Sequence, residues 1–267
     1  MFKLLVTDVD GTLLDENSSL TELNRKALKD CIRAGIQVVI ATGKSYDSVE
    51  HLVKEFDLQL PQITFGGAVT ITPERRIVEA VTIPENIYHE IVDTVRSSGY
   101  EPLVATYDGK IYYQKFSPKM KYVLEIGEKI YKIDDLKKEA YSKHAVSISL
   151  SIDADDPLDK YIRRQYGKRM LVVRSGKYFF DILNIKASKE NALKNLINIL
   201  KISKDEVISF GDSPNDISLF KESGFSIAVK NSYPELIAVS DAITDENCKS
   251  GLGKAIYKYI FNKELIF

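Results

Sequence analysis

Residues 3–14 read Lys-Leu-Leu-Val-Thr-Asp-Val-Asp-Gly-Thr-Leu-Leu. The apolar run at 4–6 has the length and branching of a buried strand, and two carboxylates, Asp8 and Asp10, follow soon after it. In open α/β sheets, ligands bind outside the carboxyl ends of the strands, so this stretch brings two acids into a crevice. Two carboxylates at such a short separation repel each other unless a cation or a proton lies between them. The stretch therefore predicts an α/β fold with a divalent metal site at the end of its first strand.

Two other interpretations of this stretch have to be weighed. A calcium-binding EF-hand loop starts with the same residue types, but it needs a glycine at its sixth position and a glutamate at its twelfth. Here Gly11 is fourth and Ser19 is twelfth, which argues against calcium. An ordinary strand-to-loop turn stays open at this point, because Asp and Gly are common turn residues.

The composition describes a chain that can build a large core and carries almost no net charge. It has 267 residues, 44% of them hydrophobic, a size at which one large domain or a core with an inserted domain is expected. Its 37 Lys and Arg residues balance 38 Asp and Glu residues, giving a formal net charge of -1. This balance gives no electrostatic reason to bind nucleic acid or an anionic membrane, so any anion site must be local.

Cysteine usage and the start of the chain indicate an intracellular protein. Cys31 and Cys248 lie far apart, with no spacing typical of a metal site or a disulfide framework. No window approaches the apolar length that spans a bilayer, and Met1 leads into the first strand without the features of a signal peptide. We expect a soluble protein in the reducing cytoplasm.

Strands and helices alternate in the first third of the chain. A capping box at 19–22 starts a helix whose apolar residues recur at helical spacing up to Gly35. A second buried strand is expected at 36–40, followed by a second amphipathic helix that reaches Phe56. This β-α-β-α order predicts a parallel sheet with right-handed crossovers. A third strand is expected at 62–65, and a hairpin at 69–72 and 76–83.

The pattern changes near Pro84. From there to about Asn184, predicted helices are mixed with antiparallel hairpins, which is typical of an α+β module. We expect helices at 85–97, around 134–140 and after Asp156, a strand at 146–152, and hairpins that turn on Asp108-Gly109 and on Ser175-Gly176. The β-α alternation then returns, with strands expected at 206–210, 225–229 and 242–244. We therefore predict an inserted domain at 84–184 within an α/β domain formed by 1–83 and 185–267.

Polar residues gather at four places in the predicted α/β domain. They are Asp8 with Asp10, Thr42, Lys189, and Asp212 with Asn215 and Asp216. Read as Asp8-Val9-Asp10-Gly11-Thr12, Thr42-Gly43, Ser188-Lys189 and Gly211-Asp212-x-x-Asn215-Asp216, they resemble the four motifs of the haloacid dehalogenase superfamily. Segment 84–184 is similar to the α+β (C2-type) cap of its Cof-type phosphatases, and the likeness covers essentially the whole chain. The resemblance implies an α/β protein with a Rossmann-like three-layer core, a mostly parallel sheet and an inserted α+β cap domain.

The resemblance assigns roles to the acids. Asp8 would attack phosphorus to form an aspartyl-phosphate that water then hydrolyses. Asp10 would protonate the leaving oxygen and then deprotonate water, a task that asks for a raised pKa. Asp8, Asp212 and the backbone carbonyl of Asp10 would hold Mg²⁺, a hard ion that prefers oxygen. Asp216 would either contact the waters of the metal or act as an acid at a helix N-terminus, and both interpretations stay open.

The resemblance also implies a phosphate-binding set. Thr42, Gly43 and Lys189 would bind the phosphoryl oxygens, the lysine as a point charge beside a helix N-terminus. Asn215 would orient Asp8 or the phosphate. Lys186 is a nearby alternative cation, but we prefer Lys189 because it opens the predicted helix.

Three positions depart from the family pattern. Lys44, Gly66 and Glu190 stand where Arg, Asn and Gly are usual. Lysine keeps the positive charge but gives up bidentate recognition of a phosphate or carboxylate. We expect the departures at Lys44 and Gly66 to alter substrate preference and to leave hydrolysis intact.

The residues and the resemblance together predict an Mg²⁺-dependent phosphatase acting on a small phosphorylated metabolite, such as a sugar phosphate. A phosphomutase that passes the same aspartyl-phosphate to a second hydroxyl is one alternative. A regulatory module that binds Mg²⁺ and phosphate without turnover is another. The second acid, Asp10, argues against a pure binding module, which has no need of an acid-base group.

Overall fold

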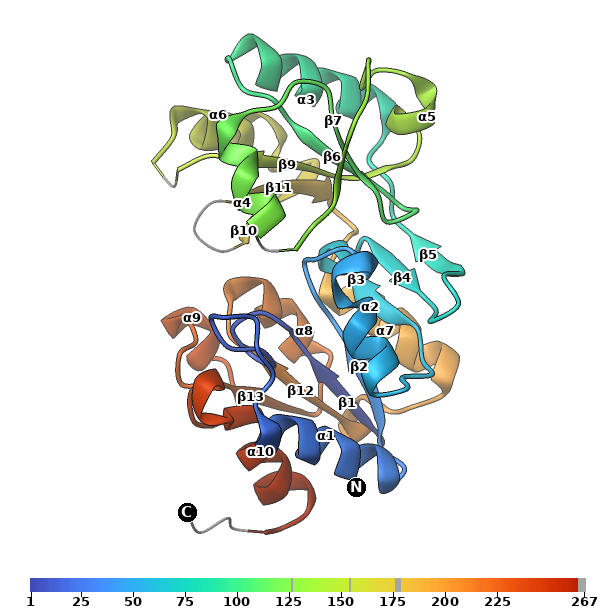
Figure 1. Ribbon diagram of the computed structural model, residues 1–267, viewed down its shortest axis with the longest axis vertical. Helices are drawn as coiled ribbons and strands as arrows, with labels where there is room; N and C mark the ends of the chain where they lie inside the picture. Colours follow the sequence, from blue (N-terminus) through green and yellow to red (C-terminus); the bar gives the residue numbers. More distant parts are fainter. Residues whose placement is uncertain (126, 154, 176–178, 264–267) are drawn as a thin grey trace.

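A five-stranded parallel sheet forms the centre of the α/β part of the protein (Figure 1). The structure is a computed structural model that describes residues 1–125, 127–153, 155–175 and 179–263. The strand order is β14-β13-β12-β1-β2, and every neighbouring pair is parallel. The strands are β1 (Leu4–Thr7), β2 (Gln37–Ile40), β12 (Val207–Gly211), β13 (Phe225–Ala228) and β14 (Ala242–Ile243). The predicted α/β class with a mostly parallel sheet is confirmed.

Helices cover both faces of this core sheet, because successive strand residues point to opposite sides. Leu5 packs in a cluster with α1 and α10, whereas Leu4 and Val6 pack in another with α7 and α8. Figure 1 shows α1 beside α10 below the sheet. The helices of this part are α1 (Glu22–Arg33), α2 (Tyr46–Glu55), α7 (Lys189–Leu200), α8 (Ile217–Lys221), α9 (Pro234–Ile237) and α10 (Gly251–Ala255). Short turns of helix accompany them at η1 (Phe65–Gly67), η3 (Lys204–Glu206), η4 (Pro214–Asp216), η5 (Asn247–Lys249) and η6 (Ile256–Ile260).

The third predicted strand is present but belongs to another sheet. β3 (Gln62–Thr64) pairs antiparallel with β4 (Val69–Ile71), which pairs with β5 (Ile77–Ala80). The expected hairpin is therefore confirmed. β3 touches the core sheet through an isolated parallel bridge between Ala41 and Ile63. The hydrogen-bond ladder between β2 and β3 does not continue, because the side chain of Gln62 accepts the backbone N–H of Ile40 at 2.7 Å.

Residues 84–184, called here the cap segment, build a six-stranded sheet in the order β10-β11-β9-β6-β7-β8. Its strands are β6 (Leu103–Thr106), β7 (Ile111–Tyr113), β8 (Ile130–Lys132), β9 (Ala145–Ser151), β10 (Met170–Ser175) and β11 (Phe179–Asn184). Its helices are α3 (Glu85–Ser97), η2 (Pro118–Met120), α4 (Lys121–Glu125), α5 (Glu139–Ser142) and α6 (Pro157–Tyr166). Apolar residues of α3 and α6 pack on one face of this sheet. Figure 1 shows the cap segment above the core sheet.

Most elements of the cap segment match the prediction, and one does not. The helix expected around 134–140 is wrong, because α5 begins only at Glu139. The side chains of Asp134 and Asp135 accept the backbone N–H groups of Asp135 and Lys137, at 3.0 and 2.9 Å, and so stabilise turns in place of a helix. No expected element corresponds to α4 or β8. Gly176, at the second expected hairpin turn, lies outside the described residues.

Hydrophobic contacts run between the cap segment and the rest of the chain. Met120 and Val123 belong to the same buried cluster as Phe65 and Ala68, whereas a second cluster lies within residues 83–182. The predicted domain limits at 84 and 184 stay a prediction. In the described part of the chain, no helix has the length and apolarity required to cross a membrane.

Candidate active site

Asp8 and Asp10 both follow the first strand, but their side chains lie in different environments. Asp8 follows β1 directly, and its backbone N–H donates to the Phe210 carbonyl of β12 at 3.0 Å. Asp8 is only 6% exposed, whereas the side chain of Asp10 is 47% exposed. The first acid is therefore fixed in the protein at the carboxyl end of β1, and the second reaches solvent.

A buried lysine forms an ion pair with Asp8. The Nζ of Lys189 lies 2.7 Å from Asp8 Oδ1 and 2.6 Å from Asp216 Oδ1, and the residue is 1% exposed. Lys189 is the first residue of α7, where the Ser188 hydroxyl accepts the Asn191 N–H and caps the helix. The sequence preference for Lys189 over Lys186 agrees with this geometry, because Lys186 is exposed.

The loop after β12 carries the other two acids. Thr12 donates its hydroxyl to Asp212 Oδ1 at 3.0 Å. Asp216 Oδ2 accepts the backbone N–H groups of Asp212 and Ser213, both at 3.1 Å, so it fixes the loop that presents Asp212. Gly11 has φ +80°, and a Cβ there would lie 2.5 Å from Asp212 Oδ2. Glycine is thus required for the close approach of the two loops.

Three acids form a possible metal site. Asp8, Asp212 and Asp216 each offer an oxygen within 4.8 Å of the others. Both oxygens of Asp216 already accept hydrogen bonds from Lys189 and the loop backbone. Among the described residues, no hydrogen bond reaches Oδ2 of Asp8 or of Asp212. These two carboxylates therefore fit a hard divalent cation such as Mg²⁺, and Asp216 fits an anchor of the loop.

The acids are poised to exchange a proton for a cation. Burial raises the pKa of Asp8 well above its usual range, and the nearby Lys189 opposes this shift only in part. Burial, reinforced by the charge of Asp216, raises the pKa of Asp212 to about 7. Burial alone would lower the pKa of Lys189, but the charges of Asp216 and Asp8 outweigh it and hold the pKa above its ordinary value. The lysine is therefore a permanent cation in this site.

The other predicted phosphate-binding residues lie at the ends of neighbouring strands. Thr42 follows the residue after β2 and is buried, and its Oγ1 accepts the Lys44 N–H at 3.1 Å, which leaves the hydroxyl proton available. Gly43 is exposed. Asn215 lies in η4, where its Oδ1 accepts the Ser213 hydroxyl at 2.6 Å. Because β2 and β12 flank β1, these groups lie around the same end of the sheet as Asp8.

Two further contacts at this end escaped the sequence analysis. Lys44 Nζ lies 2.8 Å from Asp10 Oδ1, so the lysine that departs from the family pattern holds the exposed acid. Asn231 donates its side-chain amide to the carbonyl of Gly11 at 2.8 Å and steadies the loop after Asp10. No local signal paired Asn231 with Gly11 or Lys44 with Asp10.

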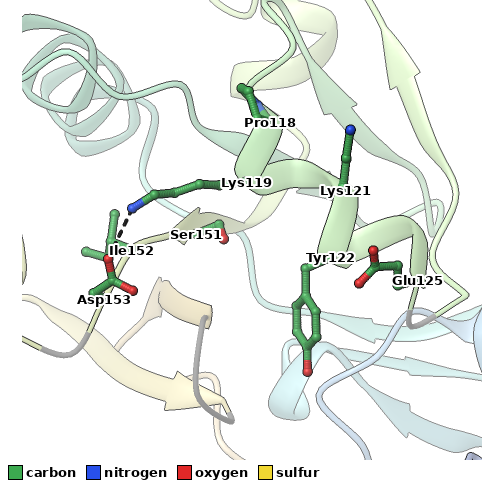
Figure 2. Close-up of a pocket in the computed structure, with 8 residues that line it drawn as sticks. All are labelled: Pro118, Lys119, Lys121, Tyr122, Glu125, Ser151, Ile152 and Asp153. Carbon is green, nitrogen blue, oxygen red and sulfur yellow. Dashed lines mark hydrogen bonds and ion pairs between the residues drawn. The ribbon is translucent and has the colours of Figure 1, made fainter.

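A cavity of about 340 Å³ opens in the cap segment, beside η2, α4 and the end of β9 (Figure 2). Figure 2 shows Lys119 facing Asp153, with 3.3 Å between Lys119 Nζ and Asp153 Oδ2, while the ring of Tyr122 extends from α4 away from this pair. The wall therefore offers an ammonium, a carboxylate and a phenol.

Comparisons with known proteins agree on one family. The model of a family described as haloacid dehalogenase-like hydrolase matches residues 5–256. Phosphatase YwpJ of Bacillus subtilis (strain 168) is 26% identical, covering 94% of this chain and 97% of its own. The 5-amino-6-(5-phospho-D-ribitylamino)uracil phosphatase YwtE of the same organism is also 26% identical, with coverages of 94% and 95%. The HAD subclass IIB sugar phosphatase BT4131 superimposes with a TM-score of 0.84 at 20% identity, covering 97% of this chain and 99% of its own, and so supports the fold.

Proposed function

The chain belongs to the haloacid dehalogenase-like hydrolases, and we propose that it is an Mg²⁺-dependent phosphatase that hydrolyses a small phosphorylated metabolite through an aspartyl-phosphate on Asp8. One observation carries this proposal. The Asp8 carboxylate is buried, with Lys189 Nζ at 2.7 Å and an oxygen of Asp212 within 4.8 Å. A carboxylate attacks an anionic phosphoryl group only where positive charge neutralises that group, and this site supplies a lysine and a place for a cation.

The steps follow from the positions of the two N-terminal acids. One carboxylate oxygen of Asp8 forms a bond to phosphorus as the bond to the leaving oxygen breaks. Asp10 gives its proton to that oxygen. Water then loses a proton to Asp10 and attacks phosphorus, which releases inorganic phosphate and restores Asp8. The Asp10 carboxyl is exposed, so it can exchange protons with solvent, and the Lys44 ammonium holds it in position.

The phosphoryl oxygens need donors in fixed positions. In our proposal, Lys189 supplies a permanent positive charge, and Thr42 supplies a hydroxyl whose proton is not otherwise used. The backbone N–H of Gly43 and the amide group of Asn215 complete the set. Preorganised donors of this kind stabilise charge that develops in the transition state.

Asp8 and Asp212, with the backbone carbonyl of Asp10, would hold Mg²⁺. The metal, when bound, neutralises the charge of the phosphoryl oxygens and orients them for in-line attack. Of the two roles left open for Asp216, its contacts favour the acid at a helix N-terminus: it accepts the backbone N–H groups of Asp212 and Ser213, just before η4, and pairs with Lys189.

We further propose that residues 84–184 form a cap domain over the core of 1–83 and 185–267, and that this cap selects the leaving group. The cavity beside α4 has charged and phenolic groups, which suits a polar, hydroxyl-bearing molecule. Two similar proteins are named phosphatases of a phosphorylated ribityl compound and of sugars, which supports a sugar phosphate or a related substrate. The free cysteines Cys31 and Cys248 fit the predicted cytoplasmic location.

Phosphate release from a panel of substrates tests the proposal. The panel contains sugar phosphates, nucleotides, pyridoxal phosphate and an aryl phosphate, each with Mg²⁺ or with EDTA. We expect turnover with Mg²⁺ and none with EDTA, and the ranking of the substrates reports what the cap segment selects. Accumulation of a sugar bisphosphate in place of free phosphate would instead indicate a phosphomutase. Binding of Mg²⁺ and phosphate without turnover on any substrate would overturn the proposal in favour of a binding module.

A further inference from the structure

A carboxylate of the cap segment is buried against a helix of the core. Glu128 is only 7% exposed. Its Oε1 accepts the backbone N–H of Ser45 at 2.9 Å, and its Oε2 accepts the Ser45 hydroxyl at 2.5 Å. Ser45 is the N-cap residue of α2, directly before its first residue, Tyr46. Glu128 therefore joins the cap segment to the N-terminus of α2.

The local structure around Glu128 presents this carboxylate. The N–H groups of Gly127 and Glu128 donate to the carbonyls of Leu124 and Val123, both at 3.1 Å, which is the hydrogen-bond pattern of a Schellman motif at the end of α4. Gly127 has φ +86°, a conformation that glycine adopts readily. Val123 is buried in the hydrophobic cluster shared with the core, so the end of α4 is held close to α2.

The N-terminus of α2 lacks the acid that would normally complete it. In a capping box, the third residue of the helix is a Glu or Gln that reaches back to the N–H of the capping Ser. In α2 that residue is Ser48, and its hydroxyl lies 3.3 Å from that of Ser45. Glu128 supplies the missing carboxylate from the cap segment. Its negative charge also interacts favourably with the positive end of the helix dipole.

This helix start is adjacent to the proposed phosphate-binding residues. Thr42 and Gly43 lie three and two residues before Ser45. Thr42 Oγ1 accepts the Lys44 N–H, and Lys44 Nζ pairs with Asp10 at 2.8 Å. A shift at Ser45 is therefore passed through a short, hydrogen-bonded stretch to the groups that bind phosphate and hold the acid.

We propose that Glu128 is a positioning residue that completes the cap of α2 from the cap segment, and thereby holds loop 42–44 in the conformation that binds the phosphoryl group. The proposal rests on the phosphatase function proposed above. In this proposal, Glu128 couples the position of the cap segment to phosphate binding without itself contacting the leaving group. When only a fraction of molecules has the competent loop, the apparent affinity falls by that fraction for every ligand that uses the loop. The effect is therefore the same for all phosphate ligands.

Glu128→Gln and Ser45→Ala test the proposal. Glutamine keeps the shape but loses the charge and cannot accept both bonds, and Ser45→Ala deletes one hydroxyl. Glu139→Gln is the matched control, because Glu139 is an exposed glutamate of the same cap segment. The measurements are the affinity for inorganic phosphate by calorimetry in Mg²⁺, kcat and KM with an aryl phosphate and a sugar phosphate, and thermal unfolding.

For Glu128→Gln we expect the phosphate dissociation constant and both KM values to rise by one common factor of roughly three to ten, from the loss of charge-assisted hydrogen bonds. kcat at saturation should change less, and Glu139→Gln should match the wild type. Adding Ser45→Ala to Glu128→Gln should have less effect than adding it to the wild type, because the two side chains share one contact.

Equal phosphate affinities in the wild type and Glu128→Gln would overturn the proposal, even with a lower melting temperature, since the role would then be structural only. A rise in KM by different factors for the two esters would also overturn the proposal, because Glu128 would then recognise the leaving group. If Glu128→Gln does not fold, the same comparison is made with Ser45→Ala alone. Failure of the wild type to hydrolyse any ester would contradict the proposed function, and the calorimetric comparison would still decide the role of Glu128.

Discussion

Replacing Lys189 with methionine should damage both stability and catalysis. The lysine Nζ lies 2.7 Å from Asp8 and 2.6 Å from Asp216, and all three side chains are almost fully buried. Methionine fills similar space, so the change mainly removes the charge. Two carboxylates then face each other without a cation, and breaking a buried ion pair in this way costs about 3–5 kcal/mol. Turnover should fall by about 10²–10³ or more, because the phosphoryl group loses a preorganised cation.

Urea unfolding at pH 7 and phosphate release measure these two effects, with Lys186→Met as the control. Lys186 is exposed and lies three residues earlier, so its variant should resemble the wild type. The unpaired carboxylates of Lys189→Met bind a proton more tightly in the folded than in the unfolded state. The variant should therefore regain stability as the pH falls toward 5. A Lys189→Met protein as stable as Lys186→Met at pH 7, or one that retains turnover, would refute this reasoning.

Three further predictions concern the neighbourhood of the site. Lys44→Met should lower kcat by about tenfold in steady-state assays while Lys44→Arg retains most of it, because the cation holds Asp10, whose acid-base role is worth at least that much. Gly67→Ala should cost about 3 kcal/mol or more in urea unfolding, since its Cβ would lie 2.2 Å from the backbone before α7, whereas Gly109→Ala, with open space, should cost about 1 kcal/mol. Burial raises the pKa of Asp212 from 3.8 to about 7, so the folded metal-free protein keeps a proton that the unfolded chain releases. Asp212 alone should lower the stability by about 1.4 kcal/mol per unit as the pH rises from about 4 to 7, so the slope should be shallower by about this amount in Asp212→Asn, and saturating Mg²⁺ should remove the contribution.

Local sequence signals predicted the elements well where they are strong. The helix at 85–97 and the hairpin on Asp108-Gly109 are present as expected. The failures have a physical cause that lies outside the local pattern. The Gln62 side chain accepts the backbone N–H of Ile40 in β2, and β3 contacts β2 only through an isolated bridge while it pairs along its length with β4. Asp134 and Asp135 use their side chains to form turns where charge and spacing suggested a helix.

The same limit applies to the site. Asp8 and Asp212 could be expected together because both follow parallel strands that are neighbours in such a sheet. The contacts of Lys44 with Asp10 and of Glu128 with Ser45 join residues 34 and 83 positions apart, and no period or motif marks either pair. They depend on how the cap segment and the loops pack, which only the three-dimensional structure gives.

The most direct measurement of the central claim is phosphate release by Asp8→Asn, compared with the wild type at saturating Mg²⁺, with the protein freed of contaminating phosphatase. Wild-type samples quenched in acid during turnover are digested in parallel and searched for a phosphorylated peptide that contains Asp8. We expect Asp8→Asn to lose turnover and any trapped phosphate to be on Asp8. Wild-type rates in Asp8→Asn, or a phosphate trapped on another residue, would contradict it.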